Sequence, residues 1–326
     1  MTRTTSRRAA LGTLAGLALA GTVPLARAQA FPNRPLRMVV PFPPGGTVDL
    51  VARELARLIG EDLKQSVVVD NKPGAGANIG AEIVARAAPD GYTILNTSVI
   101  IAQNPAVQSK LPFDVQKDFA PIAQTTYGTY VLIVPSAFPA TNMAEFIARA
   151  RSMPGKIGYG STGVGGGGHL VMEMLKSMAR IDLLHVPYKG EAPALTDLYG
   201  GQIEAIFTTS FAAAGLIKGG KVKALGHSGS RRLPALPGVA PIVETVPGFE
   251  ADGWQCLLAP AGTPREVVLR LNAAANVALK DAGFAARLRD LAFDALGGTP
   301  EQLAEAIRRD LARWRAVAQA NNIKAE

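Results

Sequence analysis

Three glycine-rich turns are the parts of this sequence best suited to hold a charged small molecule. They cover residues 43–47, 72–78 and 160–168. Each follows an expected strand and leads into an expected helix, where the first backbone N–H groups lack partners and the helix dipole favours negative charge. One such turn is weak evidence, because glycine is common wherever a strand meets a helix. Two that face each other across a domain boundary would hold a small dianion from both ends.

Hydroxyl side chains add hydrogen-bond donors to two of these turns. Thr47 closes the first turn, and Ser161 and Thr162 stand in the third. Asp49 follows in the first turn of the next helix, where a carboxylate complements the helix dipole whether or not it meets a ligand.

The same turns disfavour a nucleotide. None reads G-x-x-x-x-G-K-[ST], so the phosphate-binding lysine is missing. Residues 163–168 match G-x-G-x-x-G, but a run of glycines meets that pattern by chance, and only Asp182 follows at a distance that suits a ribose. The sequence has neither an HExxH motif nor paired His/Cys spacing, so we expect no metal and no cofactor.

A hydrolase is the best enzymatic alternative. Residues 226–230 nearly spell the nucleophile elbow G-x-S-x-G around Ser228, but Ser230 stands in the last glycine position. Residues 231–234 read Arg-Arg-Leu-Pro where the elbow needs a helix. Three histidines could act as a base, none of them in a recognisable catalytic setting: His169, His185 and His227. We therefore expect no enzyme, with an exported α/β hydrolase using Ser228 as the alternative.

Alternating strands and helices must position these turns. Short apolar runs predict buried strands at residues 36–41, 67–69, 92–95, 131–134, 157–159, 185–186, 203–207 and 222–225. Apolar periodicity predicts helices at residues 48–63, 77–87, 142–153 and 169–178. The strand–helix order implies parallel sheets with right-handed crossovers, and its repetition implies two doubly wound α/β lobes with a cleft between them.

The C-terminal third is expected to be mostly helix and to serve as scaffold. Thr263 and Thr299 each begin a predicted capping box with proline at the first helical position. In the last helix, apolar residues recur at spacings of four, four, three and four, so one face should pack on a lobe: Leu303, Ile307, Leu311, Trp314 and Ala318.

Composition narrows the class of protein. With 326 residues, 48% of them hydrophobic and 18% charged, the chain can form two globular domains. The first 30 residues carry four arginines and no acid, so the net charge of +8 falls to +4 without them. Later basic residues never form a run longer than a pair, so no nucleic-acid partner is expected. Cys256 is the single cysteine, and its apolar neighbours predict a buried, inert thiol.

The N-terminus predicts a cleaved export signal at residues 1–30. Arg3, Arg7 and Arg8 precede an apolar stretch at residues 11–25, and two small-x-small sites follow it. Residues 6–11 resemble the twin-arginine motif, although Ala10 replaces a large apolar residue, so the Tat and Sec routes both remain open. The lipobox cysteine is absent, and the mature protein is expected in the periplasm.

Several short segments of the mature chain form a recognisable series. The first loop reads Val40-Pro41-Phe42-Pro43-Pro44-Gly45-Gly46, with Asp49 and Ala52-Arg53 after it. The other segments are residues 31–35, 70–80, 89–93, 104–105, 111–114, 169–170, 185–190, 193–195, 197–198 and 259–264. Together they resemble, in order and over nearly the whole mature chain, the Bug or TctC-type receptors, the extracytoplasmic solute-binding components of tripartite tricarboxylate transporters.

The resemblance implies a type II periplasmic-binding-protein fold whose two lobes close on a ligand in the cleft. Lobe 1 would comprise residues 31–130 plus 231–326, and lobe 2 residues 131–230. Backbone amides, hydroxyls and water would hold a ligand carboxylate. Carried onto this sequence, the implied ligand-binding residues are Pro44, Gly45, Gly46, Thr97, Ser98, Ser161, Thr162, Gly163, His169, Thr209 and Ser210. His169 and Lys189 match family positions that folding or lobe closure could explain equally well.

Three positions depart from the family pattern. The family usually has glycine at Ala77, an acidic or amide residue near Thr209, and a small residue at His227. Residues 208–214 are apolar and hydroxyl-bearing, so an aromatic or amide-type acid would fit this lining better than a dicarboxylate.

The resemblance thus implies a monomeric, non-enzymatic receptor for a small carboxylate. It would serve inner-membrane transporter subunits or a sensor ectodomain. A third class, an exported scaffold without a tight small-molecule ligand, stays open.

Overall fold

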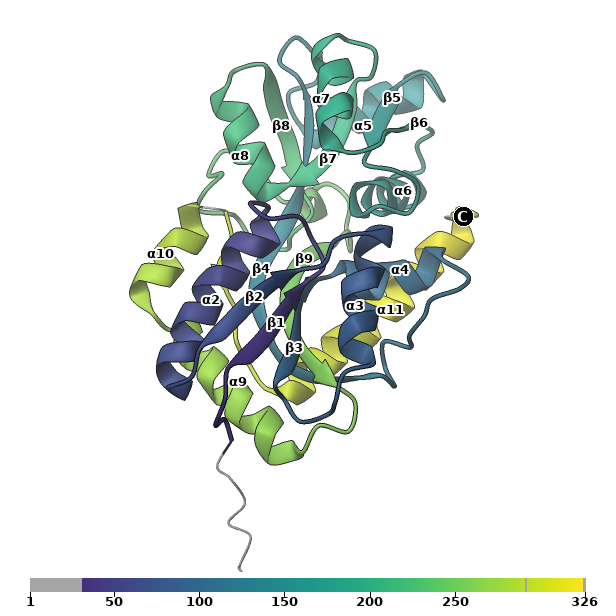
Figure 1. Cartoon of the computed structure of the whole chain (residues 1–326). Coiled ribbons are helices and arrows are strands. Elements are labelled where there is room, and N and C mark those ends of the chain that lie inside the picture. Colours follow the sequence, from purple (N-terminus) through teal and green to yellow (C-terminus); the bar gives the residue numbers. More distant parts are fainter. Residues whose placement is uncertain (1–30, 291, 325–326) are drawn as a thin grey trace, which may run out of the picture. The chain divides into compact units, whose positions relative to one another are not determined.

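A single long strand, β4 (Phe119–Pro135), belongs to two sheets in the computed structural model, which describes residues 31–290 and 292–324. From Phe119 to Thr129 this strand pairs antiparallel with β9 (Asp252–Pro260). From Tyr130 onward it pairs with β7 (Ala205–Thr209) and β8 (Val222–His227) instead. We call the two sheets the first and the second sheet, and β4 is continuous between them (Figure 1).

The first sheet contains the predicted parallel unit and one strand that the sequence did not reveal. Strand β1 (Leu36–Val40) pairs parallel with both β2 (Val67–Asn71) and β3 (Thr93–Ser98), which confirms the first β-α-β-α-β prediction. Strand β9 then lies antiparallel between β3 and β4. Its run of apolar residues was not assigned to an element, because a short buried run shows no period that separates strand from helix. The short β10 (Asp294–Ala295) pairs with β4.

Helices cover the first sheet. One cluster of buried apolar side chains joins the sheet to α3 (Asn78–Ala85), α4 (Ile100–Val107) and α11 (Pro300–Ala320). Helix α2 (Thr47–Leu63) packs along α9 (Arg265–Leu279), with α10 (Ala282–Asp290) next in the chain (Figure 1). The predicted apolar face of α2 is buried at Val51, Leu55, Ile59 and Leu63.

The second sheet has the order β4, β7, β5 (Gly158–Ser161), β6 (Leu184–Pro187), with β8 on β4. Strand β5 runs parallel to both β6 and β7, as the repeated strand–helix order predicts. Four helices connect these strands: α5 (Met143–Ser152), α6 (Gly167–Ala179), α7 (Glu191–Tyr199) and α8 (Ser210–Lys218). All five strands predicted between residues 131 and 225 are present. Four have bounds that differ by a few residues, whereas the strand predicted at residues 131–134 is only the end of β4, which begins at Phe119.

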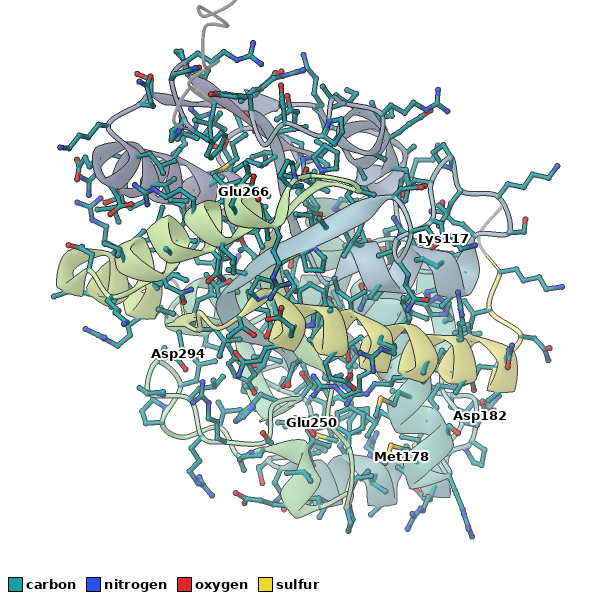
Figure 2. All side chains as sticks on the ribbon, turned by 90° about the horizontal axis from the view of Figure 1, so that it is seen from below. Lys117, Met178, Asp182, Glu250, Glu266 and Asp294 are labelled. Carbon is teal, nitrogen blue, oxygen red and sulfur yellow. The ribbon has the colours of Figure 1, made fainter. Side chains whose placement is uncertain are left out.

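The last helix, α11, packs against both sheets. Leu303, Ile307 and Leu311 belong to the cluster under the first sheet, whereas Trp314 and Ala318 belong to the cluster under the second. All five predicted apolar positions are therefore buried. Figure 2 shows α11 in yellow across β4, with Met178 of α6 near its C-terminal half.

The two predicted capping boxes have different outcomes. Thr299 forms one as predicted, because its side chain accepts from Gln302 N and the Gln302 side chain accepts from the Thr299 backbone. The prediction at Thr263 is wrong. Helix α9 begins at Arg265 with Pro264 as its N-cap, so Thr263 lies one residue too early, and its hydroxyl donates to Pro260 O at 2.7 Å instead.

The predicted export signal at residues 1–30 lies outside the described residues. Within residues 31–290 and 292–324, no helix has the length and apolar character needed to cross a bilayer.

Candidate functional site

A pocket of about 360 Å³ lies where β4 passes from the first sheet to the second. Its wall combines the loop after β1, the end of β3, the middle of β4, the end of β7 and the start of β9. The lining residues are Phe42, Pro43, Gly46, Thr47, Val48, Ser98, Val99, Thr129, Tyr130, Thr209, Gly253, Trp254, Gln255 and Phe293. Surface hollows of about 510 and 520 Å³ elsewhere are larger, but neither gathers strand ends in this way.

Three helix N-termini reach this pocket. The N-cap residues of α2, α4 and α8 all line it, and they are Gly46, Val99 and Thr209. Neither Gly46 nor Val99 provides a side-chain cap, so the first N–H groups of α2 keep their capacity to bind an anion. At the start of α4, Val99 N already donates to Trp254 O at 2.8 Å and Ile100 N to Ser98 Oγ at 3.5 Å. Thr209 differs, because its hydroxyl accepts from Ala212 N at 3.3 Å. The described lining includes no charged side chain, so an anion here would depend on these backbone dipoles.

Asp49 fixes the shape of the loop after β1. Its buried carboxylate accepts from Gly45 N at 2.9 Å, Arg53 Nε at 2.9 Å and Asn71 Nδ2 at 2.8 Å. Asn71 Nδ2 also donates to Phe42 O at 3.1 Å. Burial alone would raise the pKa of Asp49, but these donors outweigh it and lower the pKa below its usual value. The loop is therefore held by an ionised carboxylate before any ligand arrives.

Polar atoms without partners stand at the pocket wall. Gln255 and Thr129 line the cavity and are each about 3% exposed. Gln255 Oε1 and Thr129 Oγ1 are buried and make no hydrogen bond. Thr97 Oγ1, buried beside Ser98, also lacks a partner. Leaving a buried polar atom unpaired costs about 1–3 kcal/mol, so such atoms are suited to a hydrogen-bonding ligand or to water.

The residues predicted from the sequence divide into three groups. Gly46, Ser98 and Thr209 line the pocket. Pro44 and Gly45 stand in the chain between the lining residues Pro43 and Gly46, and Thr97 is buried immediately before Ser98. The remaining five do not line the pocket and stay predictions: Ser161, Thr162, Gly163, His169 and Ser210.

Ser210 and Ser161 have other partners. Ser210 Oγ donates to Ala292 O at 2.8 Å, which ties the start of α8 to the segment after α10. Ser161 Oγ donates to Gly163 O at 3.0 Å inside the glycine-rich turn after β5.

That turn adjoins the pocket through Tyr130. A side chain at Gly167, the first residue of α6, would collide with the Tyr130 hydroxyl, so only glycine lets the helix end approach so closely. Burial raises the pKa of the Tyr130 phenol against the effect of its Gln103 partner, so this hydroxyl is a neutral donor. The turn is therefore separated from the cavity by one aromatic side chain.

Several lining residues were not predicted. Gly253, Trp254 and Gln255 belong to β9, so missing that strand also removed its residues from the candidate site. Phe293 comes from the segment between α10 and β10, and no pattern in the sequence places it near the start of α2. The apolar run around Cys256 was the available signal for β9.

Ser228 is a structural junction and not an activated nucleophile. Its backbone N donates to Tyr130 O at 2.8 Å, and its Oγ accepts from Tyr130 N at 2.9 Å. The same Oγ donates to Ala251 O at 2.5 Å, while Ala251 N donates to Ser228 O at 3.0 Å. The hydroxyl proton is thus committed to a carbonyl, and His227 Nδ1 accepts from Gly229 N instead of from the serine. Residues 228–234 form no helix, so the elbow geometry is missing.

Cys256 is completely buried, as predicted. Burial raises the pKa of its thiol, so the reactive thiolate is not formed at neutral pH.

One family model and several known proteins match most of this chain. A model of the tripartite tricarboxylate transporter family receptors matches residues 51–323. A Pseudomonas sp. (strain P51) protein, described as a UPF0065 protein in the tcbD-tcbE intergenic region, is 40% identical over 92% of this chain and 91% of its own length. BugT of Bordetella pertussis is 31% identical over 94% of this chain and 95% of its own length.

Two solved structures extend the likeness to three dimensions. Rpa4515 of R. palustris with adipate has a TM-score of 0.80 and 34% identity, covering 90% of this chain and 99% of that one. MatC of Rhodopseudomonas palustris with bound malate has a TM-score of 0.75 and 33% identity, covering 88% of this chain and 99% of that one.

Proposed function

The chain belongs to the tripartite tricarboxylate transporter receptors, the TctC or Bug family, and from that membership we propose that it captures a small carboxylate-bearing metabolite outside the inner membrane. The family's members are periplasmic solute-binding receptors, and their α/β periplasmic-binding fold is the fold of this chain.

The observation that carries the proposal is the N-terminus of α2, which has no side-chain cap and opens into a pocket whose described lining has no charged side chain. A carboxylate there would accept hydrogen bonds from the backbone N–H groups that follow Gly46. Because Asp49 already holds the first loop, little ordering cost remains when an acid binds. The adipate and malate in the two solved relatives are acids of this kind.

The rest of the wall favours an acid with an apolar or aromatic body. Phe42, Val48 and Phe293 supply apolar surface, and Gln255 Oε1 needs a hydrogen-bond donor from the occupant. A hydroxyl or amide N–H at the end remote from the carboxylate would satisfy that oxygen. We therefore favour a ring-bearing hydroxy or amide acid over a compact dicarboxylate.

Capture would proceed by closure of two lobes, residues 31–130 with 231–326 and residues 131–230, around the pocket. Three segments pass close together beside it, and Ser228 links them through Tyr130 and Ala251. The captured acid would then pass to inner-membrane transporter subunits or to a sensor ectodomain. The receptor would act as a periplasmic monomer.

A ligand panel tests the proposal directly. The purified protein is heated with adipate, malate, benzoate, 4-hydroxybenzoate and the neutral benzamide, and any acid that raises the melting temperature is titrated by calorimetry. We expect a saturable shift from at least one acid and none from benzamide, with a Kd of about 1 μM, or about −8 kcal/mol. Shifts from neutral solutes alone would contradict an anion site.

Thr47→Pro isolates the backbone contribution. Thr47 is the first residue of α2, where proline fits the helix and deletes one N–H that has no partner. Gly46 has φ −76° and ψ 166°, a conformation suited to the residue before proline. We expect acid affinity to fall about tenfold, as for one charge-assisted hydrogen bond of about 1.5 kcal/mol. The matched variant Thr47→Val removes only the hydroxyl and should fold equally well, so a loss confined to Thr47→Pro assigns binding to the amide.

A further inference from the structure

Two histidine rings lie face to face beneath the second glycine loop, which we define as residues 162–168. His169 of α6 and His185 of β6 have ring centroids 3.9 Å apart and planes that differ by 7°. Tyr159 of β5 continues the stack, with its centroid 4.9 Å from that of His185. The three rings come from three different elements, so the stack fixes α6, β5 and β6 relative to one another.

Each histidine holds a different half of this loop. Gly165 N donates to His169 Nδ1 at 3.0 Å, so that nitrogen must be unprotonated. Ser161 Oγ lies 2.7 Å from His185 Nε2, donates to Gly163 O at 3.0 Å and accepts from Gly163 N at 3.2 Å. Because the single hydroxyl proton serves the Gly163 carbonyl, His185 Nε2–H is the donor to the serine.

We propose that the stacked pair of His169 and His185 positions the second glycine loop for ligand capture when both rings are neutral, and releases the loop in acid. This inference rests on the proposed function, since it takes the loop to face the captured solute. Protonation at His169 Nδ1 would replace the acceptor of Gly165 N with a donor. Protonation of both rings would place two positive charges face to face.

The loop reaches the pocket through one contact. Gly167 at its end lies against the Tyr130 hydroxyl, and Tyr130 lines the cavity. A shift of the loop therefore changes the position of α6 against the wall residue. His169 is accordingly a positioning residue, which explains why a residue matched by family resemblance is buried away from the cavity.

The charges around the stack do not compensate a protonated pair. Glu173 is 4.0 Å from His169 Nε2, but its Oε1 already accepts from Lys176 Nζ at 2.8 Å and from Tyr159 Oη at 2.5 Å. On the far side of the loop, Tyr188 donates to Asp197 of α7 at 2.7 Å, so that carboxylate is also engaged.

The protonation equilibria agree with this geometry. Burial lowers the pKa of His169. Burial and the neighbouring His169 lower the pKa of His185 to about 4. Both rings are therefore neutral at pH 7. In acid, protonation of His169 removes the acceptor of Gly165 N, and protonation of His185 adds a positive charge to the stack.

The first experiment measures hydrogen-exchange protection of the loop amides in the ligand-free protein at pH 7 and pH 4.5. Protection of residues 163–168 should fall in acid, whereas protection of the first loop, residues 42–47, should not. In His169→Asn the side-chain carbonyl takes the place of Nδ1 and cannot titrate, so the loop should stay protected at both pH values. His185→Gln likewise keeps a donor near Ser161, and His169→Leu, which has no acceptor, should expose the loop at both.

The second experiment titrates adipate into the same variants by calorimetry. Adipate itself takes up protons in this range, so each variant is compared with the unmodified protein at the same pH. At pH 4.5 the unmodified protein should bind adipate about tenfold more weakly than His169→Asn or His185→Gln, as expected for loss of a loop contact worth about one hydrogen bond, and at pH 7 the three should bind alike. His227→Asn is the control, because His227 also accepts a glycine N–H through Nδ1 but lies outside the loop.

The proposal is overturned if loop protection is the same at pH 7 and pH 4.5, or if His227→Asn alone removes the acid effect. Unchanged loop protection in His169→Leu would overturn it as well. Adipate that fails to bind at pH 7 would count against the carboxylate function and leave the exchange measurements to decide the role of the pair.

Discussion

The two glycine loops beside the pocket are held by opposite chemistry. The first, residues 42–47, is held by Asp49, an ionised carboxylate that accepts from Gly45, Arg53 and Asn71. The second, residues 162–168, is held by neutral imidazoles and a serine hydroxyl. Two loops with similar glycine-rich sequences should therefore respond differently to a fall in pH. The first loop requires the charged carboxylate of Asp49, whereas the second requires that its two imidazole rings stay uncharged.

An acid titration of stability should give the largest effect. His227 is fully buried and its pKa is lowered to about 4, so the unfolded chain binds a proton between pH 6.5 and 4 that the folded chain does not. Stability should fall as the pH falls through this window, by about 3 kcal/mol for His227 alone. His169 and His185 act in the same direction.

Two carboxyl groups, Asp252 and Asp49, also change the stability as the pH falls. Burial raises the pKa of Asp252 to about 6, so this carboxyl opposes the histidines between pH 6 and 3.8. The pKa of Asp49 is lowered below 3.8, so its contribution is present above that value and is lost only at lower pH. Urea unfolding at half-unit pH steps measures the sum. Repeating the titration in Asp252→Asn removes the opposing carboxyl. Stability of that variant that stays flat from pH 6.5 to 4.5 would contradict the expected loss at the buried histidines, two of which hold the second loop.

Replacing Asp49 should disrupt the first loop alone. Asp49→Ala leaves Gly45 N, Asn71 Nδ2 and Arg53 without their shared acceptor, so we expect a loss of about 3 kcal/mol in the free energy of unfolding. Asp49→Asn keeps one acceptor and should lose less. Exchange protection should fall at residues 42–47 and stay unchanged at residues 162–168, and equal exposure of both loops would show that they are not independent.

A variant at Ser228, outside both loops, tests whether a general loss of stability is enough to change the exchange protection of one loop alone. Ser228→Ala leaves Tyr130 N and Ala251 O without their buried partner, for an expected loss of about 2 kcal/mol measured by chemical denaturation. Neither loop should change its exchange protection selectively. A hydrolytic activity that disappears in this variant would instead restore the enzymatic alternative.

The glycine-rich turn at residues 72–78, which belongs to neither loop, should give the smallest effect, and this effect is an increase in stability. Ala77 has φ +77°, a conformation that costs an ordinary residue about 1–2 kcal/mol, and the family usually has glycine there. Ala77→Gly should raise the free energy of unfolding by about 1 kcal/mol after the entropy of the unfolded chain is counted. The control Ala81→Gly in α3, where no left-handed residue occurs, should lower it by a similar amount.

The sequence was sufficient for local features and for the family. The parallel β1–β2–β3 unit, the Thr299 capping box and the buried face of α11 depend on residues close together in the chain, and all three are confirmed. The predicted type II periplasmic-binding fold also agrees with the solved relatives.

The site depends on contacts between distant segments, which no local pattern encodes. Phe293 lines the same pocket as the start of α2, and His185 stacks on a ring sixteen residues earlier in the chain. The error at Thr263 is of another kind. The residues at 263–266 match a capping box, but Pro264 has an extended backbone and is itself the N-cap, while the Thr263 hydroxyl donates to Pro260 O.

Helix α11 has a consequence for the order in which the chain can fold during synthesis. Its first half completes the core under the first sheet, and its second half completes the core under the second. The two α/β units repeat along the sequence, yet neither of these two clusters is complete until residues 300–320 have been synthesised. We therefore expect both sheets to reach their native packing together and late, and a chain cut before residue 300 should leave apolar surface of both sheets exposed.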